Sequence, residues 1–297
     1  MKLPRFEYLS PKSLQEASSL LATYGRQARV LAGGTDLLVE LKKKASSPSL
    51  RLGGMKETIP RYVIGLREIS GLTRIEYSAG AGLCLGPMTT YADVADSSIV
   101  REKSPLLWQG CRIFSRPQIR SAATLVGNLC NASPSADIIP PLIALGAKVK
   151  IVSAGAEREV MVEDFCGGPF KTVLKEDELV AELNIPDPAE PYGWSYQRTT
   201  KRTVEDEALV VVAVLLEFAD GKRTVRRARI ALGSVSPRPI RVTKAETMLE
   251  GKKLDEDLIR QLSEVAASEA CPRSRAEYRR LMTSHMTRKA LTEACSL

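Results

Sequence analysis

The sequence predicts an α+β protein with two domains, and three observations lead to this fold class. The chain has 297 residues, about twice the length of a typical domain. A helix–strand–turn–helix pattern opens the chain, a β-rich region follows from residue 61, and three strand patterns followed by three helical patterns close it. Prolines at 186, 188 and 191 interrupt the chain between these regions. We therefore expect a first domain over residues 1–186 and a smaller α+β domain, an antiparallel sheet with helices, over residues 187–297.

The opening unit carries helix and turn signals in a regular order. Ser10 and Pro11 are typical of a helix start, and apolar residues at helical spacing follow until Gly25. Residues 29–31 predict a short strand, Gly33 and Gly34 a turn, and residues 37–44 a second helix. This order places a glycine turn between a strand and a helix start.

The later elements follow from the same reading of apolar periodicity. Strands are predicted at 62–64, 72–77, 83–85, 149–152 and 178–185, and helices at 91–96, 104–114 and 138–145, with a loop over 121–137. Strands at 194–198, 208–218 and 226–232 and helices at 244–249, 255–270 and 275–293 complete the chain. The apolar stretch 208–216 has the length of a buried strand.

Composition excludes several classes of protein. Apolar residues make up 44% and charged residues 26%, which argues against a disordered or collagen-like chain. No window approaches the ~18 apolar residues of a membrane helix, and residues 1–17 lack the apolar core of a secretory signal. We therefore expect a cytoplasmic protein without a membrane span.

The net charge is +8, and part of the basic excess lies late, at Arg273, Arg275, Arg279 and Arg280. This cluster suits either a solvated face or docking to acidic partner subunits. Aromatic residues are only 5% and form no basic–aromatic stacking platform, so we expect no nucleic-acid partner.

Cysteine and histidine spacing argues against a metal site carried by this chain alone. The six cysteines form no C-x-x-C pair, and His285 is the single histidine. Zinc and iron–sulfur sites usually show tightly spaced ligands. We therefore expect no metal ligands and small buried thiols.

Two glycine-containing segments carry the chemistry. The first, 31–37, runs from a strand through two glycines into a helix start, where backbone amides suit a phosphate. Thr35 adds a hydroxyl donor, and Asp36 suits a cap or a ribose hydroxyl. The second, 124–137, holds many short hydroxyl and amide side chains that can bind a pyrophosphate. Taken by itself, the first segment also fits an ordinary strand–helix turn. In the second segment, the Asn128 side chain also suits a hydrogen bond that stabilises its own turn.

Taken together, the motifs resemble one family. The runs 32–37, 85–91 and 117–137, with further matches at 229–235 and 278–280, are similar to the FAD-binding medium subunit of molybdenum hydroxylases, which includes the carbon monoxide dehydrogenase and xanthine dehydrogenase types. The likeness covers nearly the whole chain. It implies a two-lobed FAD-binding domain of the PCMH type, with lobes of about 1–57 and 58–186, and a C-terminal flavoprotein domain.

The resemblance also implies a set of FAD-binding positions. They are Leu31, Ala32, Gly33, Gly34, Thr35, Asp36 and Leu37 in the first segment, and Thr124, Leu125, Val126, Gly127 and Asn128 in the second. It further implies that Asp137 lies on the flavin side, that Arg198 approaches the flavin, and that Leu179 or Val180 covers the ring.

The implied function is electron transfer without a catalytic residue on this chain. In the family, electrons leave a molybdenum cofactor, pass two iron–sulfur clusters on another subunit, and reach FAD, which reduces an external acceptor. The implied partners are a small iron–sulfur subunit and a large molybdopterin subunit, which the family often assembles as a dimer of heterotrimers. Two alternatives remain: a stand-alone FAD oxidoreductase of the same fold superfamily, and an assembly or interaction protein that has lost FAD.

One position departs from the family pattern and generates a prediction. Val126 stands where the family has the first glycine of a pair, so either the backbone there has ordinary β geometry or FAD sits displaced. We expect Val126→Gly to bind FAD as tightly as the parent chain or more tightly. FAD occupancy of the purified variant measures this, and a clear fall in occupancy contradicts it.

Overall fold

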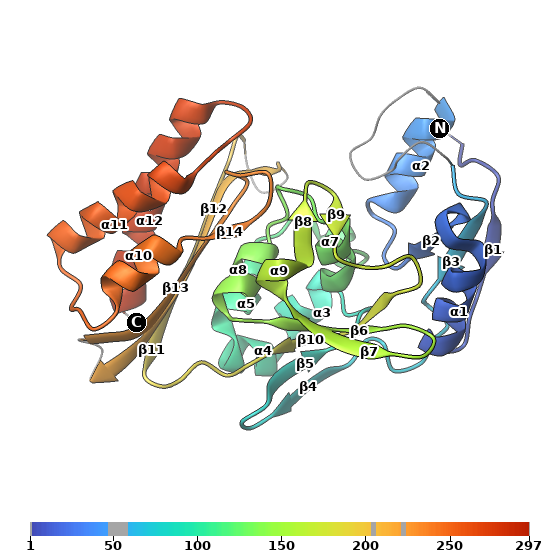
Figure 1. Cartoon of the computed structure of the whole chain (residues 1–297), viewed down its shortest axis with the longest axis horizontal. Helices are drawn as coiled ribbons and strands as arrows, with labels where there is room; N and C mark the ends of the chain where they lie inside the picture. Colours follow the sequence, from blue (N-terminus) through green and yellow to red (C-terminus); the bar gives the residue numbers. More distant parts are fainter. Residues whose placement is uncertain (1, 47–58, 203–205, 221–223, 297) are drawn as a thin grey trace.

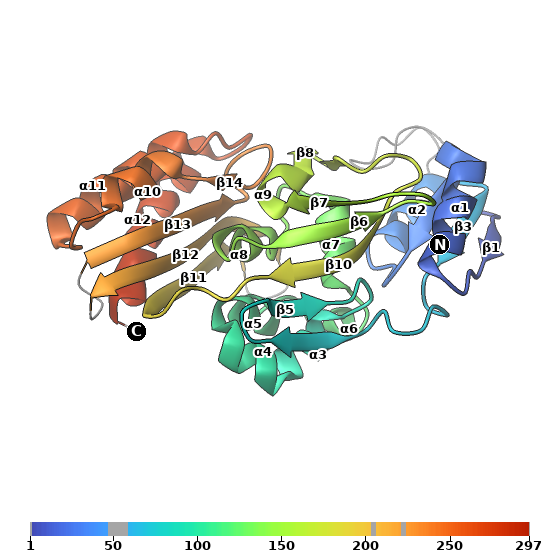
Figure 2. The same ribbon diagram turned by 60° about the horizontal axis from the view of Figure 1, so that its bottom comes forward.

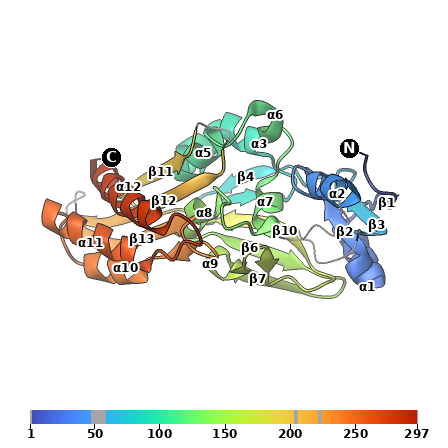
Figure 3. The ribbon, with the colours of Figure 1, turned by 90° about the horizontal axis from the view of Figure 1, so that it is seen from above.

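A computed structural model describes residues 2–46, 59–202, 206–220 and 224–296. Three main sheets follow one another along the longest axis, from the N-terminal lobe through a central lobe to a C-terminal unit (Figures 1 and 3). The architecture confirms the predicted α+β class. The expected boundary between the lobes, at 57/58, lies outside the described residues. None of the helices in the described part of the chain combines the length and apolar character that crossing a bilayer requires.

The N-terminal lobe is a three-stranded parallel sheet of order β1-β3-β2. Its elements are β1 (Glu7–Leu9), α1 (Leu14–Tyr24), the 3-10 turn η1 (Gly25–Gln27), β2 (Ala28–Leu31), α2 (Leu37–Ser46) and β3 (Tyr62–Gly65). The expected cap at Ser10 is wrong, because Ser13 caps α1 and its hydroxyl accepts the Glu16 amide at 3.0 Å. Glu16 also accepts the amide of Lys12, the residue before the cap, at 2.7 Å, so both of its contacts hold the chain at Ser13 rather than at Ser10.

The central lobe is a five-stranded antiparallel sheet of order β4-β5-β10-β6-β7, with helices on one side (Figure 2). Its strands are β4 (Ile75–Ser78), β5 (Gly82–Leu85), β6 (Lys148–Val152), β7 (Glu157–Met161) and β10 (Leu179–Ile185), with the small pair β8 (Cys166–Gly168) and β9 (Lys171–Thr172). Its helices are α3 (Tyr91–Asp96), α4 (Ser98–Lys103), α5 (Pro105–Arg112), α6 (Pro117–Arg120), α7 (Leu125–Asn131), α8 (Ile139–Ala144) and α9 (Val162–Phe165).

The segment 121–137, expected as a loop, contains helix α7. The Thr124 hydroxyl accepts the Gly127 amide at 3.0 Å and caps the helix. Leu125, Val126 and Leu129 are buried in the core. The sequence reading gave weight to the polar residues and overlooked a capping threonine followed by apolar residues at helical spacing.

The C-terminal unit is a four-stranded antiparallel sheet covered by three helices on one side (Figure 1). Its elements are β11 (Tyr192–Thr200), β12 (Ala208–Asp220), β13 (Thr224–Gly233), β14 (Ile240–Arg241), α10 (Thr243–Leu249), α11 (Glu256–Glu269) and α12 (Ala276–Ser296). Strand β12 is buried on both faces. Val210, Val212 and Val214 pack in the core beneath the helices, whereas Val211 and Ala213 join the core of the central lobe. This double burial explains its unbroken apolar sequence.

Basic side chains of the C-terminal sheet connect it to the central lobe. Arg229 and Arg238 donate to the carbonyls of Ile143 and Cys166, at 3.3 and 3.1 Å. Arg241 contacts Glu163 at 2.9 Å. The seam between the two units is therefore polar at its rim and apolar at its centre.

Close contact between β11 and α12 generates a stability prediction. A Cβ atom added at Gly193 would lie 1.7 Å from the carbonyl oxygen of Ala294, which no side-chain rotation can relieve. We expect Gly193→Ala to lower the free energy of unfolding by about 2 kcal/mol, measured by urea titration. Gly155→Ala is the control, because nothing lies within 4 Å of its added Cβ. Equal stability of the two variants would contradict the prediction.

Candidate functional site

The first glycine segment brings the N-terminal lobe against the central lobe. Strand β2 ends at Leu31, and Gly34 adopts φ +74° before α2 begins. A Cβ atom at Gly33 would lie 1.9 Å from the carbonyl oxygen of Ala122. Only glycine permits this approach of two backbones, so the turn is built to meet the second segment.

The second glycine segment lies directly against the first. The position of a Cβ on Gly127 is 3.8 Å from the Cβ of Ala32. Thr124 pairs with Thr90 in an isolated β-bridge, and the Leu125 amide donates to the Thr89 carbonyl at 3.2 Å. Two segments about ninety residues apart in the sequence thus meet at the junction of the lobes, as the resemblance implies.

A buried ion pair joins the second segment to the C-terminal unit. Arg198 on β11 donates through Nε to Asp137 Oδ2 at 3.0 Å, and the two side chains are only 7% and 5% exposed. Tyr196 donates its hydroxyl to the Asp137 carbonyl at 3.2 Å. Burial raises the pKa of Asp137 to about 6, although the charge of Arg198 acts in the opposite direction.

The carboxylate of Glu207 acts electrostatically on both Asp36 and Asp137. Partial desolvation raises the pKa of Asp36, and the charge of Glu207 raises it further. Glu207 acts in the same direction on Asp137. Asp36 is exposed by surface area, yet enough protein surrounds its carboxylate to disfavour the charge. Sequence analysis missed Glu207, because nothing in its local sequence places it beside residues 36 and 137.

Unsatisfied buried polar atoms show that the site suits a polar ligand. Among the described residues, Asp137 Oδ1, Asn128 Oδ1 and the Tyr91 hydroxyl are buried without a hydrogen-bond partner. Burial raises the pKa of the Tyr91 hydroxyl, and the charges of Cys111, Asp137 and Asp36 act in the same direction. Native proteins rarely leave such groups unpaired. Together with the glycine turn, they fit the hydroxyl- and phosphate-rich chain of a dinucleotide such as FAD.

The remaining candidate residues have different placements. Leu31, Thr35 and Leu37 are half-buried, whereas the side chains of Leu125 and Val126 are in the core and leave only backbone for a ligand. Leu179 is buried in a separate cluster with residues of α1, β2 and β3. Its expected contact with a flavin ring stays a prediction, with no support from this placement.

Val126 does not have the β geometry that was one of the two expectations. It occupies the second position of α7 and has helical backbone, because Thr124 starts the helix immediately before it. A valine is accommodated there without positive φ. Its buried side chain supports α7, so Val126→Gly also removes core packing.

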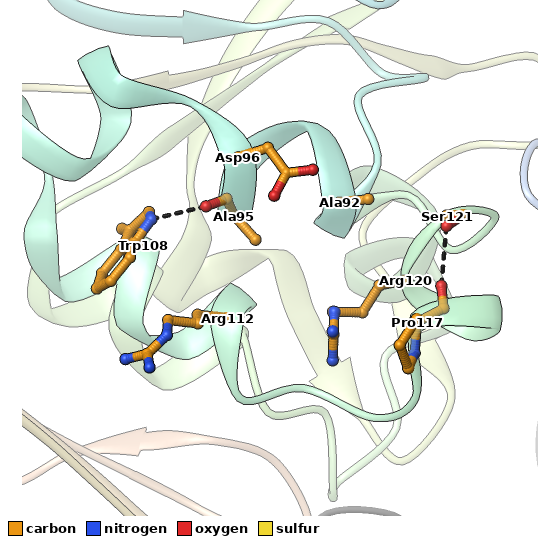
Figure 4. Close-up of a pocket in the computed structure, with 8 residues that line it drawn as sticks. All are labelled: Ala92, Ala95, Asp96, Trp108, Arg112, Pro117, Arg120 and Ser121. Carbon is orange, nitrogen blue, oxygen red and sulfur yellow. Dashed lines mark hydrogen bonds between the residues drawn. The ribbon is translucent and has the colours of Figure 1, made fainter.

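A hollow of about 300 Å³ lies beside the start of the second segment, between α3, α5 and α6 (Figure 4). Arg120 projects toward it, whereas the Arg112 guanidinium lies against Trp108, 5.2 Å from the centre of its ring. Trp108 forms its wall, with its indole donating to the Ala95 carbonyl at 2.8 Å. Arg120 is held by the carbonyls of Phe114 and Ser115. None of the predicted site residues lines this hollow.

The raised pKa of Asp137 generates a pH prediction. The folded carboxyl has a pKa of about 6 against an ordinary 3.8, so between these values the folded state holds more protons. The free energy of unfolding therefore falls as pH rises from about 4 to 6 and levels off above 6, by at most ~1.4 kcal/mol per pH unit. Asp137→Asn should lose this dependence.

Urea unfolding of the ligand-free chain at several pH values measures it. The exposed carboxyl of Asp164 on α9 provides the control, and Asp164→Asn should follow the parent chain. A constant difference in unfolding free energy between the parent and Asp137→Asn across this window would contradict the prediction.

Two family matches cover most of the chain. Residues 4–188 match the FAD binding domain in molybdopterin dehydrogenase, and residues 195–294 match the CO dehydrogenase flavoprotein C-terminal domain. The nicotine 6-hydroxylase medium subunit of Paenarthrobacter nicotinovorans is 32% identical, over 99% of both chains. The carbon monoxide dehydrogenase medium chain of Hydrogenophaga pseudoflava is 30% identical, over 98% of this chain and 97% of that one. The xanthine dehydrogenase FAD-binding subunit of Escherichia coli O157:H7 is also 30% identical, over 97% and 95%.

Solved structures agree over the full length. A carbon monoxide dehydrogenase from Hydrogenophaga pseudoflava, lacking the Mo-pyranopterin moiety of its cofactor, matches with a TM-score of 0.91 at 31% identity, covering 100% of this chain and 99% of that one. Quinoline 2-oxidoreductase from Pseudomonas putida 86 matches with a TM-score of 0.88 at 30% identity, with the same coverage. The glycine segments, the unpaired polar atoms and these matches lead to one conclusion: the chain belongs to the FAD-binding subunits of the molybdopterin dehydrogenases, the molybdenum hydroxylase family.

Proposed function

We propose that this chain is the flavin-binding electron-transfer subunit of a multi-subunit molybdenum hydroxylase. It receives electrons from iron–sulfur clusters of a partner subunit and passes them to an external acceptor. The observation that carries the proposal is the contact between the two glycine segments, Gly33 against Ala122 and Gly127 beside Ala32. The second segment also holds Asn128 Oδ1 and Asp137 Oδ1, which are buried without a partner among the described residues. FAD, when bound, supplies the one- and two-electron chemistry, and the protein supplies position and electrostatics.

Each part of the site has a distinct role in this proposal. The backbone of 31–37 and 124–128 holds the pyrophosphate, because the glycines let it approach closely. Asp137 and Arg198 face the flavin side. Asp137 Oδ1 accepts a hydrogen bond when ionised and donates one when protonated, and a pKa of about 6 makes both forms accessible near neutral pH. Arg198 fixes that carboxyl, because its guanidinium is itself held in place: Nη2 donates to the Asp206 carbonyl at 2.6 Å.

The proposed partners are a small iron–sulfur subunit and a large molybdopterin subunit, assembled as a dimer of heterotrimers. The relatives' names support placing the chain in a complex, because they describe a medium subunit and medium chains. The substrate is then chosen on the large subunit.

The proposal predicts a flavin content that can be measured directly. The purified full chain should show a flavin absorption spectrum, and heating should release FAD, identified by mass, at close to one per chain. A chain that holds no FAD even when co-purified with both partner subunits would overturn the proposal.

Gly33→Ala tests whether the glycine contact forms the FAD site. The added Cβ would meet the Ala122 carbonyl oxygen at 1.9 Å and push the two segments apart. We expect at least a roughly tenfold rise in the FAD dissociation constant, since ~1.4 kcal/mol of lost binding corresponds to that factor. Gly155→Ala, at an open surface position, should bind FAD as the parent does. Unchanged FAD affinity in Gly33→Ala would show that FAD does not depend on this contact.

A further inference from the structure

Arg279 connects the last helix to two strands of the C-terminal sheet. It lies in the first turn of α12, and its side chain is half-buried. Its Nη1 donates to the carbonyl of Leu209 on β12 at 2.7 Å and to the carbonyl of Ser234, which follows β13. One guanidinium nitrogen thus holds two backbone carbonyls from separate elements.

Ser234 has a backbone that needs this support. It adopts φ +66°, a left-handed conformation that is costly for a residue with a Cβ atom. It is buried, and its hydroxyl has no hydrogen-bond partner among the described residues. The side chain therefore does not hold the turn, and the contacts of its carbonyl and amide do.

The amide of Ser234 reaches the segment that leads into the site. It donates to the Pro134 carbonyl at 3.0 Å, across the seam between the C-terminal unit and the central lobe. Pro134 lies three residues before Asp137, whose carboxyl is paired with Arg198. A chain of contacts, Arg279–Ser234–Pro134, therefore runs from α12 to the approach to Asp137.

The charge environment shows that Arg279 is held at a cost. Burial lowers its pKa, and the neighbouring positive charges of Arg275 and Arg273 lower it further, whereas the charge of Glu207 raises it. Its Nε is buried without a hydrogen-bond partner among the described residues. A half-buried cation with one buried, unsatisfied donor is a poor stabilising device for a helix start. The left-handed backbone of Ser234 is a second cost, and backbone strain of this kind clusters at functional sites.

We infer that Arg279 is a positioning residue for the FAD site: it fixes the left-handed turn at Ser234, and that turn fixes residues 134–137 and thereby the Asp137 carboxyl. The expected effect on FAD binding rests on the proposed function, whereas the ordering of residues 134–137 by Arg279 does not. The hydrogen bonds of Arg279 within the described residues go to the carbonyls of Leu209 and Ser234, and its effect on the site passes through the backbone of Ser234 and Pro134.

Hydrogen exchange on the ligand-free full chain tests the geometry. In Arg279→Gln, the amides of Ser234 and of residues 132–137 should exchange about tenfold faster, because a hydrogen bond to a charged group is lost. Arg280→Gln is the matched control: it removes the same charge from the next residue of α12, and Arg280 donates to the Ala270 carbonyl, at 3.2 Å, rather than to the turn at Ser234. Equal exchange in this segment for the two variants overturns the inference.

FAD titration of the same proteins tests the consequence. The dissociation constant should rise about tenfold in Arg279→Gln, with an altered absorption spectrum of the bound flavin. Arg280→Gln should match the parent in both. A loss of thermal stability in Arg279→Gln with unchanged FAD affinity and spectrum would reduce Arg279 to a structural role and overturn the inference.

A conservative variant keeps the test decisive if Arg279→Gln does not fold. Arg279→Lys retains the charge and one carbonyl contact, and it should show effects of the same kind but smaller. If the parent chain holds no FAD even together with its partner subunits, the proposed function fails, whereas the exchange measurement still decides whether Arg279 orders the segment 132–137.

Discussion

The buried ion pair between Asp137 and Arg198 is the contact on which the arrangement of the molecule depends. It joins the central lobe to the first strand of the C-terminal sheet where both side chains are almost fully removed from water. Removing such charges from water costs several kcal/mol per ion, so the pair persists only with good geometry and further hydrogen bonds. Arg198 finds a second acceptor in the Asp206 carbonyl, whereas Asp137 keeps one oxygen without a partner in the described part of the chain. The protein therefore tolerates an unsatisfied group at the place where a cofactor is expected.

The two lobes meet through backbone rather than through large side chains. Gly33 lies so close to Ala122 that no other residue fits, and Gly127 lies beside Ala32. Small residues at this contact leave peptide groups accessible, and peptide groups are what a pyrophosphate needs. The same contact therefore packs the lobes together and forms the surface on which FAD is proposed to lie.

The C-terminal sheet serves two cores at once. Alternate residues of β12 pack under α10–α12 and against the central lobe, so the sheet transmits the position of the helices to the site. Polar groups at the rim of this sheet also connect it to the central lobe. They are the side chains of Arg229, Arg238 and Arg241 and the amide of Ser234. Helix α12, at the C-terminal end, is thereby coupled to the carboxyl of Asp137, which lies in the first half of the sequence.

The sequence by itself determined the α+β class, most of the strands and helices, the two glycine segments and the family, because these depend on local periodicity and on short motifs. It missed α7, since a capping threonine was read as part of a polar loop, and it placed the first helix cap at Ser10 rather than Ser13. Only the tertiary structure showed that Gly33 touches Ala122, that Arg198 pairs with Asp137, and that Glu207 and Arg279 lie near the same site. Those contacts join residues about sixty to ninety positions or more apart, and burial rather than local sequence decides the charge state of Asp137.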